Sequence, residues 1–183
     1  MSAPMAVALT GTPGTGKSAV AARLARSISV VEVGELARQL GAARGRGRAV
    51  TVDLPRLRRA LARSGGLGRV DVVVGHLAHL LPVSAAIVLR CHPVELGRRL
   101  RSAHRGSAVE RHDNLVCEAT DAIVQEAIGR GLPVFEVDTT GRSIATVAAA
   151  VRRRILDGGR PSVGSVDWLA DPSVTRLLLR RSR

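Results

Sequence analysis

Aromatic side chains are almost absent from this chain of 183 residues, which contains one Phe, one Trp and no Tyr. The core must therefore be built from Ala, Val, Leu and Ile, and a sheet that stacks RNA bases on aromatic rings is disfavoured. With 45% hydrophobic residues, the length suits one domain with one substantial core and room for a small appendage.

Cysteine and long apolar runs are also scarce. Cys91 and Cys117 stand in apolar segments without the spacing of metal ligands, which predicts buried, reduced thiols in an intracellular compartment. The chain lacks an apolar run near the ~20 residues that a membrane-spanning helix needs, and residues 1–8 lack the basic region of a secretory signal. We expect a soluble, cytoplasmic protein without a membrane partner.

Lysine occurs only once. Of the 28 Lys and Arg residues, 27 are arginine. Lys17 lies in the sequence Gly11-Thr12-Pro13-Gly14-Thr15-Gly16-Lys17-Ser18, a full match to the phosphate-binding pattern GxxxxGK[ST]. A compact ammonium on a flexible stem fits between the β- and γ-phosphates, whereas a guanidinium is a wide planar fork. The pattern predicts binding of a nucleoside triphosphate.

An apolar run at 5–10 precedes this loop, and apolar residues at helical spacing follow at 17–27, so the motif joins a strand to a helix. Gly14 and Gly16 let the backbone approach the phosphates, and the helix contributes its positive end. Lys17 is expected to reach the β- and γ-phosphates, and Ser18 to place its hydroxyl on Mg²⁺.

The formal net charge of +13 favours polyanionic partners such as RNA or a ribosomal surface. An arginine-rich genome or the charged surface of a thermophile explains the same charge equally well. The composition alone leaves both explanations open.

Apolar, β-branched runs recur along the chain, each followed by a helix-like or loop segment, which predicts an α/β fold with a parallel sheet covered on both faces. Besides the first run, these strands are expected at 28–33, 70–74, 86–91 and 133–137. Helices are expected at 53–63, 114–128 and 143–156.

Two segments break this alternation, at 41–51 and 102–113, where a nucleotide kinase carries its acceptor-binding segment and its lid. Arginines cluster in and before the second segment, and lid arginines neutralise charge on the transferred phosphoryl group. The cluster consists of Arg99, Arg101, Arg105 and Arg111.

The strand at 70–74 has no acid at its carboxyl end to hold the water shell of the metal. Asp71 lies three residues before Val74 and cannot easily take that role, so Ser18, phosphates and waters, with Glu35 through water, are left to hold Mg²⁺. His76 follows the strand and could position a water or an acceptor hydroxyl, act as a general base, or cap a turn. A metal site of His76, His79 and His92 lacks a completing carboxylate or thiolate.

After a linker at 157–161, Asp171-Pro172 is expected to start a short helix that runs to Arg181. The apolar residues of this C-terminal segment are expected to dock on the core and, failing that, to face a partner. They are Trp168, Leu169, Leu177, Leu178 and Leu179.

The chain resembles the archaeal and nuclear adenylate-kinase-like ATPases of small-ribosomal-subunit maturation, the coilin-interacting nuclear ATPase family. The resemblance spans about residues 5–156 and rests on the glycine loop at 10–18 together with further segments, of which GHLAHLLP and DTTG are much more specific than the loop. The further segments are VGELAR at 33–38, GHLAHLLP at 75–82, VLRCHP at 88–93, Arg99-Leu100, Asp113-Asn114 and VDTTG at 137–141.

The resemblance implies a P-loop nucleoside-monophosphate-kinase fold, three αβα layers around a five-stranded parallel sheet, with ATP and Mg²⁺ as ligands. It further implies adenylate kinase and ATPase activity with AMP or another nucleoside monophosphate as acceptor, and a role in small-subunit rRNA processing with a ribosomal protein. Residue by residue, it assigns Gly14, Gly16, Lys17, Ser18 and Ala19 to the ATP loop, Glu35 and Arg38 to the acceptor segment, His76 to the family's Asp-x-His motif and Arg105 to the lid.

The chain departs from the family at Val74, which replaces the aspartate of that motif, at Ser107, which replaces a lid aromatic, and in the Arg-Gly alternation of the acceptor segment. We expect a kinase domain at 1–156, with the acceptor segment at 33–56 and the lid at 102–114, followed by a linker and short helix at 157–183. The alternatives are a nucleotide-gated RNA or ribosomal-protein binding module with little turnover, and a small-molecule kinase acting on shikimate or a nucleoside.

Overall fold

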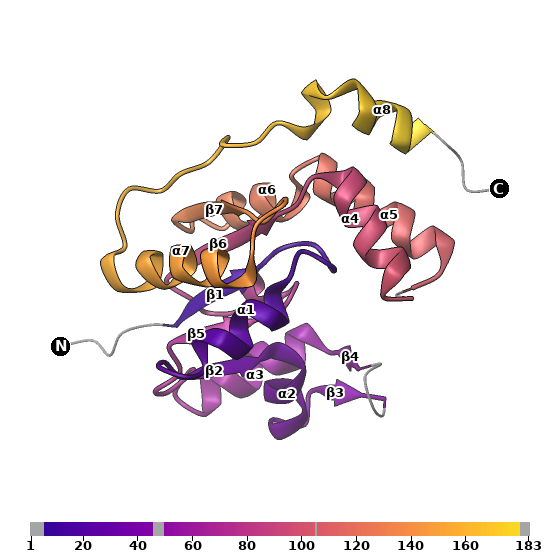
Figure 1. Ribbon diagram of the computed structural model, residues 1–183. Coiled ribbons are helices and arrows are strands. Elements are labelled where there is room, and N and C mark those ends of the chain that lie inside the picture. Colours follow the sequence, from indigo (N-terminus) through magenta and orange to yellow (C-terminus); the bar gives the residue numbers. More distant parts are fainter. Residues whose placement is uncertain (1–5, 46–49, 105, 180–183) are drawn as a thin grey trace.

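A parallel sheet forms the centre of the computed structural model, which describes residues 6–45, 50–104 and 106–179 (Figure 1). The sheet has five strands in the order β2-β5-β1-β6-β7, and every neighbouring pair is parallel. The strands are β1 (Val7–Thr10), β2 (Val30–Glu32), β5 (Val72–Val74), β6 (Ala85–Arg90) and β7 (Val134–Asp138). Each lies in or overlaps a run that the sequence identified, with β6 beginning one residue earlier and β7 ending one residue later than predicted, so the predicted α/β fold is confirmed.

Helices cover both faces of the sheet, which gives the predicted three layers. On one face, α1 (Lys17–Leu24) and α7 (Ile144–Asp157) pack on strand residues such as Leu9; on the other, α2 (Val33–Gln39), α3 (Leu54–Arg63) and α6 (Ala122–Gly129) pack on residues such as Ala8. Successive strand residues alternate between these two apolar clusters, because side chains alternate across a strand.

Side-chain caps set the starts of two helices where the sequence placed them. The Asp53 carboxylate accepts a hydrogen bond from the backbone N–H of Arg56 at the start of α3. The Ser143 hydroxyl accepts one from Thr146 at the start of α7. Each cap satisfies a backbone donor that the first turn leaves without an intrahelical acceptor.

The predicted single helix at 114–128 is wrong, since the structure has two helices there, α5 (Ala108–Ala119) and α6. The break falls at Asp121, whose φ of 56° is left-handed. Its carboxylate is ion-paired with the buried guanidinium of Arg90. This contact with another part of the fold holds a backbone conformation that helical periodicity does not anticipate.

Helices occupy most of the segment at 102–114 where the lid is predicted, and the lid itself stays a prediction. Helix α4 (Pro93–Ser102) ends where the lid was expected to begin, and α5 starts at Ala108 with Ser107 as its cap. The connection therefore covers 103–107, and Arg105 within it lies outside the described residues.

The acceptor segment contains a short antiparallel pair, β3 (Ala43–Arg44) and β4 (Thr51–Val52). Residues 46–49 between these strands also lie outside the described residues.

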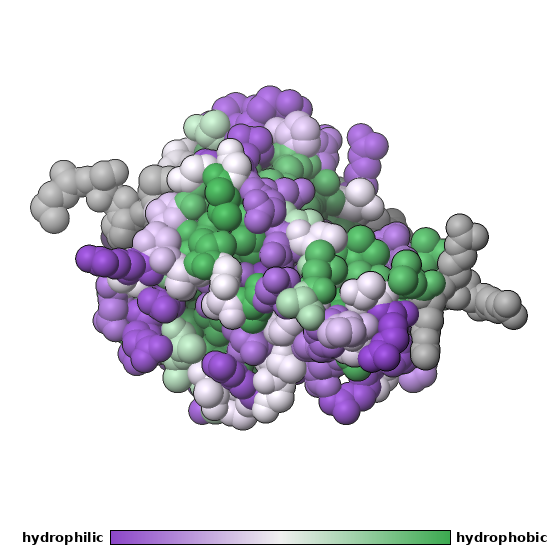
Figure 2. All heavy atoms as spheres, turned by 90° about the horizontal axis from the view of Figure 1, so that it is seen from above, coloured by the Kyte–Doolittle hydropathy of each residue, from purple (hydrophilic) through white to green (hydrophobic). Residues whose placement is uncertain are grey.

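The C-terminal segment returns to the domain, as predicted. It forms a 3₁₀ turn, η2 (Trp168–Ala170), and helix α8 (Pro172–Leu179), which lies beside α4 and α5 (Figure 1). Leu177 and Leu178 pack on a buried cluster of Cys91, Leu96, Leu100 and Leu115. Leu169 and Leu179 remain exposed, and the face seen from above carries apolar patches between hydrophilic side chains (Figure 2).

None of the helices within the described ranges combines the length and the apolar character that a bilayer span requires.

Candidate nucleotide-binding site

The loop at residues 11–16 leads from the carboxyl end of β1 into α1, as the sequence motif predicts. Gly14 and Gly16 have φ values of 97° and 100°, which side chains rarely adopt. Gly16 is the N-cap of α1 and supplies no side-chain hydrogen bond to the first turn. A Cβ atom built on Gly16 meets nothing within 4 Å. Backbone N–H groups and the positive helix end thus border open space, and this arrangement fits a polyphosphate.

On its other side, the loop packs closely against the domain. A Cβ atom on Gly14 would lie 2.8 Å from Leu96 Cδ1, and one on Gly11 would lie 2.4 Å from Leu89 O. Both approaches are shorter than ordinary side-chain contacts. At Gly11 the obstacle is backbone, so packing requires glycine there, whereas at Gly14 the ends of the leucine side chains would have to shift.

The cationic and hydroxyl groups of the motif gather at this loop. Lys17 Nζ donates hydrogen bonds to Gly11 O at 2.7 Å and to Thr12 O at 2.8 Å. Ser18 and Ala19 lie exposed in the first turn of α1. The ammonium of Lys17 is therefore held against the carbonyls of the loop at the start of α1.

His76 follows β5 on the same edge of the sheet, and its imidazole is exposed. The hydroxyl of Thr10 donates to the backbone carbonyl of His76 at 3.3 Å, which ties this residue to the end of β1. Partial loss of solvent lowers the pKa of the His76 imidazole, and the nearby ammonium of Lys17 lowers it further. The ring is therefore neutral at pH 7 and available as a hydrogen-bond acceptor.

His79 is buried and serves a different purpose from His76. Its Nδ1 lies 3.0 Å from Thr10 Oγ1, and its Nε2 lies 2.9 Å from Glu126 Oε2. Burial lowers its pKa, although Glu126 opposes the shift. Within the part of the chain that the structure describes, no three His, Cys, Asp or Glu side chains converge on a metal site.

The carboxyl end of β5 carries no acid, as the sequence indicated. Asp71 lies at the opposite end, where its carboxylate accepts a hydrogen bond from the backbone N–H of Ser29 at 2.7 Å. On the neighbouring strand, the exposed Glu32 is in register with Val74. Glu32 therefore brings a carboxylate next to the position where the motif's aspartate is missing, although the sequence analysis did not select it.

The predicted acceptor residues lie on α2, which begins directly after β2 on this same edge. Glu35 and Arg38 form an exposed ion pair of 3.1 Å. Among the predicted lid arginines, Arg99 donates to Thr139 O at 3.0 Å and Arg111 donates to Gly106 O at 2.6 Å. In Figure 1, the phosphate loop, the hairpin β3–β4 and the helices α4 and α5 lie toward the same side of the molecule.

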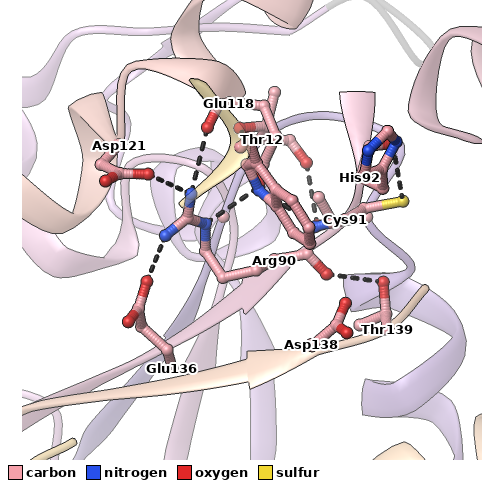
Figure 3. Close-up of polar contacts among 12 residues, drawn as sticks. Thr12, Arg90, Cys91, His92, Glu118, Asp121, Glu136, Asp138 and Thr139 are labelled. Atoms are coloured by element: carbon pink, nitrogen blue, oxygen red, sulfur yellow. Dashed lines mark hydrogen bonds and ion pairs between the residues drawn. The ribbon is translucent and has the colours of Figure 1, made fainter. Parts of the chain in front are cut away.

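A buried charge cluster under the phosphate loop was missed by the sequence analysis (Figure 3). Arg90, at the end of β6, pairs with Glu118 at 2.9 Å and also with Asp121 and Glu136. The side chains of Arg90 and Glu118 are each only 2% exposed. The available signal was an arginine inside an apolar strand, because a buried cation requires acidic partners.

Comparison with known proteins identifies the family to which this sequence belongs. Residues 7–121 match the AAA domain family. Two archaeal proteins named "Putative adenylate kinase" align over 174 residues each. The one from Archaeoglobus fulgidus is 38% identical and covers 91% of this chain and 93% of its own length, and the one from Halobacterium salinarum is 42% identical and covers 90% and 98%.

Among solved structures, a shikimate kinase from Acinetobacter baumannii in complex with shikimate superimposes with a TM-score of 0.57 over 85% of this chain and 94% of its own. At 15% sequence identity, this likeness concerns the fold alone. The fold, the P-loop and the archaeal relatives agree. The chain therefore belongs to the AAA domain family of P-loop proteins, and is a homologue of these archaeal proteins over nine-tenths of its length.

Proposed function

We propose that this protein is an ATP-dependent nucleoside monophosphate kinase, with AMP as the acceptor, that also hydrolyses ATP. The observation that carries the proposal is the position of the phosphate loop at the carboxyl ends of the strands, with a helical segment on either side of it. The loop offers amides, Lys17 and Ser18 to a triphosphate, while α2 presents Glu35 and Arg38 from the end of β2, which is separated from β1 by β5. The names of the archaeal relatives support the same activity.

The reaction requires little covalent participation from the protein. A phosphate oxygen of AMP attacks the γ-phosphorus of ATP, and the bond from that phosphorus to the β,γ-bridging oxygen breaks as the new bond forms. The electron pair leaves with ADP, and both products are ADP. Lys17 and the loop amides would stabilise the charge on the phosphates, and neutral His76 would accept a hydrogen bond from the acceptor or a water.

The residues also fit a magnesium ion, because the hydroxyl of Ser18 stands in the first turn of α1 beside the loop. Mg²⁺ would supply charge neutralisation across the β- and γ-phosphates. We propose Ser18 as its protein ligand and Arg105 as the lid cation.

The direct test is incubation of the purified protein with ATP, Mg²⁺ and AMP, with ADP followed by chromatography. We expect two ADP for each AMP consumed, and phosphate release when AMP is omitted. Lys17→Ala provides the control for a contaminating kinase. Folded protein that produces neither ADP nor phosphate would exclude the enzymatic proposal, and profiling with other monophosphates, nucleosides and shikimate would identify a different acceptor.

The alternative is a nucleotide-gated binding module with little turnover. The observation in its favour is Val74 at the end of β5, a residue that supplies no carboxylate of its own for the water shell of a metal. Tight ATP-dependent binding to a partner with negligible ADP production would favour this alternative over the kinase.

We further propose a role in processing the rRNA of the small ribosomal subunit, together with a ribosomal protein. The net charge of +13 suits a polyanionic partner, and the family resemblance of the sequence suggests the ribosome. Binding to small-subunit rRNA and ribosomal proteins, with and without ATP, tests the role. If the affinity for small-subunit rRNA equals the affinity for an unrelated RNA, the binding is nonspecific electrostatic attraction and the proposed role is refuted.

A further inference from the structure

Thr12 occupies the centre of the hydrogen bonds that shape the phosphate loop. It is only 1% exposed. Its carbonyl oxygen accepts hydrogen bonds from Lys17 Nζ at 2.8 Å, Thr15 Oγ1 at 2.9 Å and the Thr15 backbone N–H at 3.2 Å. Any rotation of the Thr12 peptide would therefore move the acceptor of the lysine and disturb the turn that aims the loop amides.

The hydroxyl of Thr12 is held by the carboxylate of Glu118. It donates to Glu118 Oε2 at 2.6 Å, and both residues are buried (Figure 3). The other oxygen of Glu118 accepts from Arg90 Nε at 2.9 Å and from the Cys91 backbone N–H at 3.0 Å. Glu118 thus joins the loop to the end of β6 through a charged acceptor, a stronger type of hydrogen bond than a neutral one.

The C-terminal segment supplies a further donor to this carboxylate. Trp168 Nε1 donates to Glu118 Oε1 at 3.2 Å. The indole also packs edge-on against His92, with ring centroids 5.1 Å apart, and His92 Nε2 lies 2.9 Å from Asp171 Oδ2. A single carboxylate therefore connects the tail to the phosphate loop.

Other contacts hold the same tail against the charge cluster. The backbone N–H of Ser165 donates to Glu136 Oε2 at 3.0 Å, and Ser162 extends β7 through a parallel bridge to Phe135. Arg90 contacts Glu136 through Oε1, so the Ser165 N–H satisfies the carboxylate oxygen of Glu136 that Arg90 does not reach.

We propose that Glu118 is a positioning residue for the nucleotide site, and that docking of Trp168 on it couples the tail at 162–171 to the phosphate loop. When the indole is docked, Glu118 is held in the orientation that receives the Thr12 hydroxyl. When the indole leaves, Glu118 Oε1 keeps Arg90 Nε and the Cys91 N–H but loses its third donor, so the carboxylate is held less firmly and the loop that depends on it binds phosphate less well. This inference rests on polyphosphate binding by the loop, which is part of the proposed function.

The substitutions that test this coupling change one hydrogen bond each. Thr12→Val removes the hydroxyl at nearly constant volume, and Thr12→Ser keeps it. Trp168→Phe removes the indole N–H and keeps an aromatic ring against His92. By calorimetry with Mg-ATP, we expect Thr12→Val to weaken affinity about tenfold, the size of one hydrogen bond to a charged group. Thr12→Ser should stay within about twofold of the unchanged protein.

A double-substitution cycle then measures the coupling itself. We expect Trp168→Phe to weaken affinity severalfold, and the Thr12→Val, Trp168→Phe double variant to bind little worse than Thr12→Val alone. Independent effects of the two substitutions, or an unchanged affinity in Thr12→Val, would overturn the proposal. Absence of binding by the unchanged, folded protein would instead refute the proposed function.

A second readout follows the tail directly, first in the unchanged protein. Trp168 is the only Trp in a chain without Tyr, so its emission reports on the tail. The probe is inorganic triphosphate with Mg²⁺, which has no base to stack on the indole. We expect saturating triphosphate to change the emission of the unchanged protein but not of Thr12→Val. If the Trp168 emission of the unchanged protein stays the same when triphosphate is bound, the tail and the loop are uncoupled.

Discussion

Arg90 Nε lies 2.9 Å from Glu118 Oε1, and both side chains are 2% exposed. A buried ion pair is costly to break by removal of one partner, because the other charge remains without water. Here three carboxylates depend on the same guanidinium. A single substitution of Arg90 can therefore test how much this cluster stabilises the fold.

We expect Arg90→Met to lower the free energy of unfolding by about 3–5 kcal/mol, since it leaves Glu118, Asp121 and Glu136 without their cation. Urea denaturation measures the change. Arg98→Met is the matched control, because Arg98 pairs with Glu95 on the exposed face of α4 and its side chain is 71% exposed. An exposed pair contributes under about 1 kcal/mol. Equal losses in the two variants would contradict the stabilising role of the cluster.

Lys17→Ala should remove most of the affinity for Mg-ATP or most of the turnover, with little effect on unfolding, because the ammonium contacts loop carbonyls and solvent and not the apolar core. Lys17→Arg should fail to restore binding, since the planar fork does not fit the loop. Calorimetry and urea denaturation report the two properties separately. Arg23→Ala, in the last turn of the same helix, should bind as the unchanged protein does.

Gly14→Ala and Gly16→Ala should differ in stability, although both residues have φ near 100°. Each variant loses about 1–2 kcal/mol from the left-handed backbone. Only Gly14→Ala places a Cβ against Leu96 and Leu100, at 2.8 and 2.9 Å, and overpacking of this kind costs roughly a further 1–3 kcal/mol. Denaturant unfolding of both variants measures the difference. A Gly16→Ala protein that is the less stable of the two would contradict the packing of the loop against α4.

Much of the fold was predictable because its signals are local. The β-branched runs and the glycine motif place the strands and the loop without knowledge of the rest of the chain. The break before α6 was not predictable, since Asp121 is held by Arg90, 31 residues away in sequence. Likewise, His76 and His79 look alike in the sequence, and only burial between Thr10 and Glu126 distinguishes the structural histidine from the exposed one.

His79 should make the protein less stable in acid. Burial lowers the pKa of this histidine below its ordinary value of 6.5, so the folded state binds fewer protons than the unfolded state just below pH 6.5. The contribution is complete above that pH and is lost as pH falls toward the lowered pKa of the folded state. We expect the free energy of unfolding to decrease from pH 7.5 to 5.5, and His79→Gln to flatten this dependence. An equally steep dependence in His79→Gln would assign the effect to other groups.

Cys91 should resist thiol reagents in the folded protein. Burial raises the pKa of this thiol to about 11, and burial also raises the pKa of Cys117, so few reactive thiolates exist at pH 8. We expect slow reaction with an aromatic disulfide in buffer and rapid reaction of both thiols in denaturant, followed by absorbance. The Cys117→Ser variant isolates Cys91, and its rapid labelling under native conditions would contradict the buried position.

The connection from Thr12 through Glu118 to Trp168 also has a consequence for the order of folding. Thr12 and Glu118 are 106 residues apart, and Trp168 follows Glu118 by 50 more. During translation, the residues of the glycine loop are made long before the indole that completes its support. Contacts of such high sequence separation form late and slowly, so a nascent chain acquires its competent phosphate-binding shape only after synthesis has passed the tail.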